Sequence, residues 1–321
     1  MEKNLLNKNL ISESLNLIIN SKKITLLTHF RPDADGISAC VALENIFLEM
    51  GKNIETVLPC KPEFELKRMP KKYFINKHEQ DPDLIIALDT ANYERLYFPE
   101  SFRNKKFINI DHHVSNSLNS DFNFINPDSS STCEILFEII NIWEKDLNKK
   151  LINKYTAECL LFGILYDSMI FHTQSTYPST LNISAKLMEL GANLYDLKTE
   201  LICNKNPNII IFWGKILSNI KISKSKKAAW AKITQQDLKE NNLSINSLVG
   251  FNNFLSQISG IEYTLLFYQT ENGQTKVSLR SKTEDVNKLA TPFGGGGHTN
   301  AAGILSNEPI DILIEKITKN L

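Results

Sequence analysis

The sequence lacks several features that would place it in a specialised class of protein. Neither charge is in excess, since 36 lysines and arginines balance 36 aspartates and glutamates. A protein that binds long nucleic acid usually carries a basic excess, so we expect any anionic substrate to be small or to be bound by a local group of residues. No apolar run approaches the roughly 18 residues of a membrane span, and the N-terminus has no long apolar segment before a small-residue cleavage site. We therefore expect a cytoplasmic protein with no membrane partner.

Cysteine is scarce and scattered. The cysteines are five in number, and no two are spaced as Cys-x-x-Cys; they are Cys40, Cys60, Cys133, Cys159 and Cys203. This pattern predicts reduced, mostly buried side chains and argues against a zinc-thiolate site. The chain also lacks internal repeats and low-complexity tracts, and its 321 residues are enough for one large or two ordinary domains.

Acidic and imidazole side chains follow several short apolar runs. The runs 24–27, 53–58, 84–88 and 106–110 alternate with segments of helical pattern at 9–20, 37–50, 130–146, 151–166, 181–190 and 194–202. This alternation predicts an α/β fold with a mainly parallel sheet flanked by helices. The side chains that follow such runs are His29, Asp89, Asp111, His112 and His113, and a further acidic residue, Asp167, follows the apolar stretch 160–166. Because ligands bind at the carboxyl ends of strands in open α/β sheets, we expect these residues to share one site.

Two aspartates follow the first run and have two interpretations. Pro32 is expected to hold Arg31 extended, and in an extended chain Asp33 and Asp35 project to the same side, where they repel unless a cation lies between them. The alternative is that both only cap the helix that follows. The recurrence of acidic residues at other strand ends favours a metal site.

The donor set indicates which metals fit. Carboxylate and imidazole ligands without thiolate suit Mn²⁺ or Mg²⁺, and the carboxylates are too many for one ion, which points to two. A metal pair of this kind can hold a nucleophilic water and stabilise in-line displacement at phosphorus. We expect one of His112 and His113 to bind metal and the other to face the substrate, with Asp111 orienting an imidazole.

The pattern of predicted helices and strands changes in the C-terminal third. The segment 204–208 breaks the pattern, so we expect a catalytic domain at 1–203, a linker and connecting helix at 204–220, and a smaller α/β domain at 221–321. In the smaller domain we expect a strand at 228–233, a helix at 243–258, and a hairpin of 261–269 and 274–281 around Asn272-Gly273. The polar segment 61–83 is expected to be a surface connection, with His78 solvated.

A second group of residues is predicted to bind substrate. The backbone N–H groups of Gly294, Gly295, Gly296 and Gly297 can approach an anion, and His298 adds a donor; the run is not a P-loop, because no Lys-Ser/Thr follows. Arg280 lies on the strand face opposite Val277 and Leu279, and is expected to be free to grip a terminal phosphate. Arg95 and Asn116 are weaker candidates for which a surface role is equally compatible, and a packing or surface role is favoured for His172.

Five motifs resemble those of the DHH phosphoesterase family. Four are Thr28-His29-Phe30-Arg31-Pro32-Asp33-Ala34-Asp35, Leu88-Asp89-Thr90, Asp111-His112-His113 and Tyr166-Asp167-Ser168, and a fifth, from Phe293 to Gly303, is similar to the glycine-rich signature of the DHHA1 substrate-binding domain. The resemblance covers nearly the whole chain. It implies that His29, Asp33 and Asp89 bind one metal, that Asp35, Asp89, His112 and Asp167 bind the other with Asp89 bridging, and that His113 contacts the reacting phosphate. The family often has Asp-Thr-Gly at the fourth motif, so Met169 leaves the shape of the nearby pocket wall open.

The two-domain layout is most similar to the nanoRNase and 3′-phosphoadenosine-5′-phosphate (pAp) phosphatase branch of that family. It implies a phosphodiesterase, dependent on Mn²⁺ first and Mg²⁺ second, that cleaves short oligonucleotides or dinucleotides such as pApA to 5′-mononucleotides. The alternative is a pAp phosphatase. Cyclic dinucleotide cleavage, pyrophosphatase or polyphosphatase activity, and a non-catalytic nucleotide-binding regulator are less expected, and a homodimer is left open.

Overall fold

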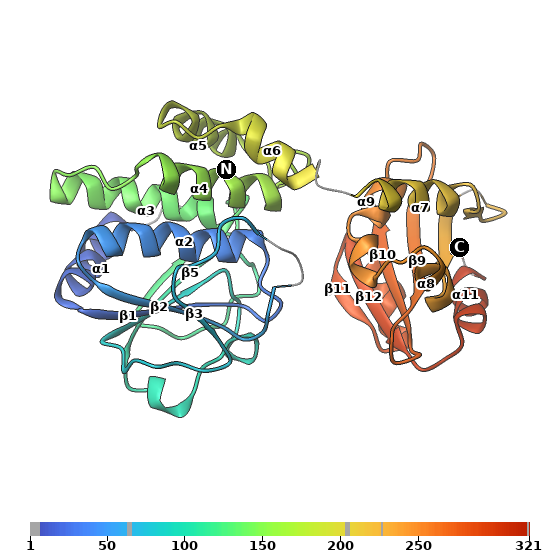
Figure 1. Ribbon diagram of the computed structural model, residues 1–321, viewed down its shortest axis with the longest axis horizontal. Coiled ribbons are helices and arrows are strands. Elements are labelled where there is room, and N and C mark those ends of the chain that lie inside the picture. The colour runs from blue at the N-terminus through green and yellow to red at the C-terminus, as the bar shows by residue number, and fades with distance from the viewer. Residues whose placement is uncertain (1–6, 63–65, 203–205, 226, 320) are drawn as a thin grey trace. The chain divides into compact units, whose positions relative to one another are not determined.

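The computed structural model describes residues 7–62, 66–202, 206–225, 227–319 and 321, with the backbone alone at position 298. The chain divides into two compact units, 1–204 and 205–321 (Figure 1). Each unit has its own sheet and its own hydrophobic core. The units are described separately below.

The first unit is built on a parallel sheet. Its strands are β1 (Lys23–Thr28), β2 (Asn53–Leu58), β3 (Tyr73–Ile75), β4 (Leu84–Leu88), β5 (Lys106–Asp111) and β6 (Phe122–Ile125). They lie in the order β3-β2-β1-β4-β5-β6, and each neighbouring pair is parallel. The central strands are buried on both faces, which explains their continuous Val/Ile/Leu runs.

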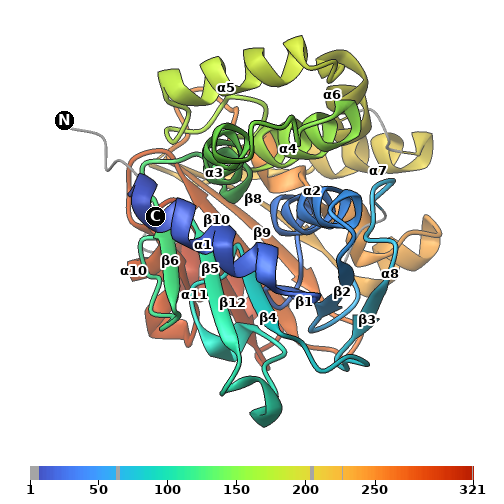
Figure 2. The ribbon, with the colours of Figure 1, turned by 90° about the vertical axis from the view of Figure 1, so that its left-hand side faces the viewer.

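Helices cover one face of this sheet. They are α1 (Lys8–Asn20), α2 (Ala34–Glu49), α3 (Thr132–Leu147), α4 (Lys154–Asp167), α5 (Pro178–Glu189) and α6 (Leu194–Ile202). Figure 2 shows α2 next to the sheet, α3 and α4 above α2, and α5 farthest from the sheet. Because α4 lies between other helices, it is apolar nearly all round and carries no simple amphipathic stripe. The other face of the sheet is covered by loops with two short 3₁₀ helices, Tyr93–Arg95 and Glu100–Phe102.

The second unit has a mixed sheet with a core on each face. Its strands are β7 (Lys221–Ile222), β8 (Ala228–Ile233), β9 (Tyr263–Gln269), β10 (Thr275–Ser281), β11 (Gly296–His298) and β12 (Ala301–Ser306), in the order β11-β12-β10-β9-β8-β7. Neighbours are antiparallel except β8 and β9. One core includes α10 (Val286–Ala290) and α11 (Ile310–Thr318), and the other includes α7 (Pro207–Leu217), α8 (Gln235–Glu240) and α9 (Phe251–Leu255).

The predicted fold class, a mainly parallel sheet flanked by helices followed by a smaller α/β domain, is confirmed. The helix predicted at 243–258 is wrong: Gly250 adopts a left-handed φ of 86° and separates a 3₁₀ turn (Ile245–Leu248) from α9. Several strands were not predicted, among them β3 and β6 in the first unit and β11 and β12 in the second. The helix expected to connect the domains is α7, which packs in the second unit through Phe212, Trp213 and Ile216. None of the described helices is both long and apolar enough to cross a bilayer.

Candidate metal centre

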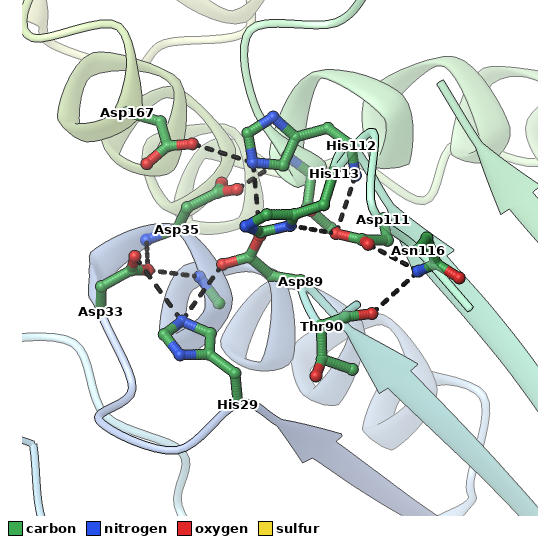
Figure 3. Close-up of polar contacts among 12 residues, drawn as sticks. His29, Asp33, Asp35, Asp89, Thr90, Asp111, His112, His113, Asn116 and Asp167 are labelled. Carbon is green, nitrogen blue, oxygen red and sulfur yellow. Dashed lines mark hydrogen bonds and ion pairs between the residues drawn. The ribbon is translucent and has the colours of Figure 1, made fainter. Parts of the chain in front are cut away.

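The candidate centre lies where the connections of the first sheet diverge. Strands β1 and β4 are neighbours, while β2 lies beyond β1 on one side and β5 beyond β4 on the other. Open α/β sheets bind ligands outside the carboxyl ends of the strands at such a point. His29 follows β1, Asp89 follows β4, and β5 ends at Asp111, so the sheet brings these predicted residues together (Figure 3).

The carboxylate of Asp89 lies at the middle of the group. Its Oδ2 atom is 3.4 Å from Nε2 of His29, and its Oδ1 atom is 3.5 Å from Nε2 of His112. The residue is 2% exposed and has a left-handed φ of 58°. A non-glycine residue in this region stores strain that persists only where its surroundings hold it. The two distances show that each oxygen of Asp89 faces a different imidazole.

One set of donors comprises His29, Asp33 and Asp89, whose candidate ligand atoms lie within 4.8 Å of one another. Oδ2 of Asp33 is 3.6 Å from Nε2 of His29, while its Oδ1 accepts hydrogen bonds from the first N–H groups of α2. Asp33 is thus both a helix cap and a candidate ligand. The extended chain predicted here is wrong: Arg31 has a left-handed φ of 58°, and α2 begins at Ala34.

A second set comprises Asp35, His112 and Asp167. Nε2 of His112 is 3.1 Å from Oδ2 of Asp167, the last residue of α4. Asp35 is fully buried, and its two oxygens accept the backbone N–H groups of Thr132 at 2.7 Å and Cys133 at 3.1 Å. Because α2 starts so early, Asp35 points toward the start of α3, away from the Asp33 cap.

The electrostatics of the two sets indicate excess negative charge. Burial alone would lower the pKa of His29, but contacts with Asp33 and Asp89 raise it to about 10. Burial is likewise outweighed at His112, where Asp167 and Asp89 raise the pKa well above its usual value. The pKa of Asp35 is raised by burial and by the charges of Asp89 and Asp167. Imidazolium ions thus balance the carboxylates here, a role that divalent cations would fulfil better, so the donor set fits the predicted metals.

The second histidine of the Asp-His-His motif, His113, is positioned by its contact with Asp111. Nδ1 of His113 lies 2.7 Å from Oδ1 of Asp111, which also accepts the backbone N–H of His112. Oδ2 of Asp111 accepts the side-chain amide of Asn116 at 2.6 Å, and the same amide donates to the carbonyl of Thr90. The structure thus places Asn116 behind Asp111, where it positions that carboxylate. A candidate ligand atom of His113 also lies within 4.8 Å of those of Asp89 and His112.

Arg95 lies beside the centre, on the 3₁₀ turn after β4. Its Nη2 atom is 3.1 Å from Nδ1 of His29, which is also 2.9 Å from the carbonyl oxygen of Phe30. In the imidazolium form, and in a form that would bind a metal through Nε2, Nδ1 carries a proton and donates to Phe30, so Arg95 has to find another acceptor. Met169, two residues beyond Asp167, is 43% exposed and has a left-handed φ of 48°.

Two other histidines lie outside the centre. His172 is exposed, as the favoured surface role predicts. His78 is not simply solvated, as expected, because its ring packs 4.7 Å from that of Phe102 and is half-buried. Of the cysteines, Cys40, Cys133 and Cys159 are buried, and Cys203 lies outside the described residues.

In the second unit, Arg280 is less free than predicted. Val277 and Leu279 are buried while Arg280 is half-buried, as the predicted alternation requires. However, its Nε donates to Oδ1 of Asn253 at 3.1 Å and its Nη1 to the carbonyl of Leu279 at 3.0 Å. Two of its donors are therefore already used within the unit.

The glycine run also differs from expectation. The N–H groups of Gly294 and Gly295 donate to backbone carbonyls, and that of Gly297 donates to Oδ1 of Asn287 at 3.0 Å. A Cβ at Gly295 or Gly297 would collide with the backbone of β12, so these glycines permit close strand packing. The expected row of free N–H groups is wrong at these three positions. The side chain of His298 lies outside the described part of the chain.

The sequence prediction missed three residues that shape the centre. Thr132 donates to Asp35 and Asp89, and a Cβ at Gly36 or Gly163 would collide with neighbours of the ligands. One signal was available for α3: Ser131 and Glu134 have the spacing of a helix start, and Ser131 does cap it. Nothing in the local pattern marks the glycines, because their neighbours are distant in sequence.

Comparison with known proteins agrees with this geometry. Residues 23–164 match the model of the DHH family, N-terminal domain, and residues 226–320 match that of the DHHA1 domain. A Bacillus subtilis protein named bifunctional oligoribonuclease and PAP phosphatase NrnA is 30% identical over 284 residues, which cover 87% of this chain and 88% of that one. The chain belongs to the DHH family.

Solved structures share the fold of this DHH/DHHA1 chain. An exopolyphosphatase-related protein from Bacteroides fragilis superposes with a TM-score of 0.89 at 22% identity, covering 99% of this chain and 97% of that one. RecJ from Thermus thermophilus, in complex with Mn²⁺, superposes with a TM-score of 0.58 at 12% identity. The superposition covers 98% of this chain and 54% of the RecJ chain. Family membership makes the chain a phosphoesterase hydrolase that uses divalent metal ions.

Proposed function

We propose that this DHH phosphoesterase hydrolyses short oligoribonucleotides and dinucleotides to 5′-mononucleotides with two divalent cations, Mn²⁺ in preference to Mg²⁺. The observation that carries the proposal is the Asp89 carboxylate, whose two oxygens face His29 and His112 from opposite sides. A carboxylate between two sets of donors suits a bridging ligand. The two imidazoles among the oxygen donors, His29 and His112, favour Mn²⁺ over Mg²⁺, which prefers oxygen alone.

The residues divide between the two cations by distance. His29, Asp33 and Oδ2 of Asp89 would hold one, and Asp35, His112, Asp167 and Oδ1 of Asp89 would hold the other. When bound, such a pair supplies an activated water and stabilises the attacking and leaving oxygens of an in-line displacement.

The neighbouring residues would orient the substrate. Asp111 accepts Nδ1–H of His113, and in the imidazolium form the ring would also donate Nε2–H to the reacting phosphate. With a proton on Nδ1 of His29, Arg95 would be available to donate to a phosphate oxygen. In the second unit, Arg280 with its remaining donors, and the loop of β11 with His298, are proposed to hold the rest of the nucleotide.

Short substrates are supported by the charge balance and by the relatives. The chain has no net charge, so it lacks the basic excess that holds long nucleic acid. The Bacillus subtilis relative is named for both oligoribonuclease and PAP phosphatase activity. The same two-cation site could cleave the monoester of pAp, and this is the second candidate function.

A substrate panel tests the proposal. The enzyme, stripped of metal and then loaded with Mn²⁺ or Mg²⁺, is given pAp, pApA and single-stranded RNA of 2 to about 20 residues, with products separated by chromatography. We expect activity to require added metal and to be highest on the shortest strands. The logarithm of the binding constant should fall with the logarithm of the salt concentration with a shallow slope of about −1 to −2, since roughly 0.7 counterions are released per neutralised phosphate. Preference for long strands with a steep slope, or full turnover in excess EDTA, would contradict the proposal.

The second unit has its own test. Arg280→Ala should raise KM for pApA about tenfold or more, because it removes a charge-assisted phosphate contact, without changing Mn²⁺ affinity. Unchanged KM would remove Arg280 from the substrate site.

A further inference from the structure

The first turn of α3 contacts the candidate metal centre through Thr132. The hydroxyl of Thr132 donates to Oδ1 of Asp89 at 3.1 Å, and its backbone N–H donates to Oδ2 of Asp35 at 2.7 Å. The residue is fully buried. One residue thus contacts two carboxylates that arrive from β4 and α2, 43 and 97 positions away in the sequence.

The hydroxyl of Thr132 is not needed to start the helix. Ser131 is the N-cap of α3, and its own hydroxyl accepts the N–H of Glu134 at 3.1 Å. Threonine at the next position has only modest helix propensity, so a hydroxyl there gives the isolated helix no advantage. The polar group is buried at this point because its partner is Asp89.

Thr132 contacts the second donor set through Asp35, and it contacts Asp89, which belongs to the first set, only at Oδ1. Oδ1 of Asp89 faces His112, and Asp35 belongs to the same set as His112. The other set is held by different groups: Asp33 by the N–H groups of Asp35 and Gly36, and His29 by the carbonyl of Phe30. The hydroxyl of Thr132 therefore holds the oxygen of Asp89 that faces His112, while Oδ2, which faces His29, is not its acceptor.

We propose that Thr132 is a positioning residue whose hydroxyl holds Oδ1 of Asp89 and thereby sets the affinity of the second cation, the one that Asp35, His112 and Asp167 would hold. The proposal rests on the proposed two-cation function. Removal of a hydrogen-bond partner behind a metal ligand typically costs 10- to 100-fold in metal affinity. The first cation, held by His29, Asp33 and Oδ2 of Asp89, keeps its affinity.

The test is a Mn²⁺ titration of the metal-stripped protein followed by electron paramagnetic resonance, in which free Mn²⁺ gives the six-line signal and a coupled pair gives a distinct one. Thr132→Val keeps the shape and the backbone N–H but removes the hydroxyl, and Thr132→Ser restores it. Thr156→Val is the matched control, since Thr156 is a buried threonine in the first turn of α4 whose hydroxyl accepts from Asn45. Urea unfolding without metal checks that each variant folds, and Thr132→Ala replaces Thr132→Val if that variant does not.

The wild type should bind two Mn²⁺ and show the coupled signal. Thr132→Val should bind one Mn²⁺ normally and the second 10- to 100-fold more weakly, while Thr132→Ser and Thr156→Val behave as the wild type. Two wild-type affinities in Thr132→Val, or equal loss of both ions, would overturn the role of Thr132 and leave the two-cation function standing. A wild type that binds a single Mn²⁺ would overturn the two-cation function, and the proposal for Thr132 with it.

Discussion

Raising the pH should destabilise the metal-free protein, and His29 sets the size of the effect. The pKa of its imidazole is raised to about 10 in the folded chain, against an ordinary value near 6.5 in the unfolded chain. Below about pH 6.5 both states hold the proton and the stabilisation is fully present. Between 6.5 and 10 only the folded state holds it, so the free energy of unfolding falls by about 1.4 kcal/mol per pH unit.

From pH 7 to 8.5 the loss from His29 alone is therefore about 2 kcal/mol. The raised pKa of His112 acts in the same direction, because it also means that the folded state binds more protons above pH 7. The lowered pKa of Asp89 acts only in acid, outside this window. The metal-free protein should thus be clearly less stable at pH 8.5 than at pH 7.

Urea unfolding in EDTA at the two pH values measures this loss. His29→Asn, which cannot hold the proton, should reduce the slope by about 1.4 kcal/mol per unit. With saturating Mn²⁺ the slope should nearly vanish, because the metal would hold the neutral imidazole and the unfolded imidazole is also mostly neutral above about pH 7. A metal-free protein whose stability does not change from pH 7 to 8.5, or a His29→Asn variant with an unchanged slope, would refute the reasoning.

Two further predictions concern the carboxylates and the packing behind them. Asp89→Asn should lose both ions by elemental analysis and nearly all activity, whereas Asp111→Asn should keep both ions and lose activity about 10- to 100-fold, because it acts through His113; two retained ions in Asp89→Asn would argue against a bridge. Gly163→Ala should cost about 1–3 kcal/mol in urea unfolding and weaken Mn²⁺ binding, because the new Cβ would lie 2.6 Å from Oδ1 of Asp35. Gly214→Ala, in a helix where the Cβ meets nothing within 4 Å, is its control and should not change Mn²⁺ binding.

The residues of the candidate centre were predictable because parallel strands end together. The runs before His29, Asp89 and Asp111 are apolar on both faces, which marks them as central strands, and the structure pairs them side by side. Any polar residue that follows such a run must lie at the same edge of the sheet. The choice of a metal site over a simple helix cap then depended on several acidic residues recurring at that edge.

The support around those residues was not predictable, because it depends on distant packing. Asp35 meets α3, 97 positions away, and only the tertiary fold decides that a helix start would lie there. In the second unit, Arg280 and Gly297 were predicted to offer free donors, but Asn253 and Asn287 already accept from them. The helix predicted over 243–258 failed because the left-handed turn at Gly250 outweighs an apolar pattern.

The central claim is that Asp89 bridges two cations, and anomalous diffraction from crystals grown with Mn²⁺ tests it most directly. The account predicts two manganese peaks about 3.5–4 Å apart. Oδ2 of Asp89 should bind the ion next to His29, and Oδ1 should bind the ion next to His112. A single peak, or two ions of which Asp89 binds only one, would contradict the account.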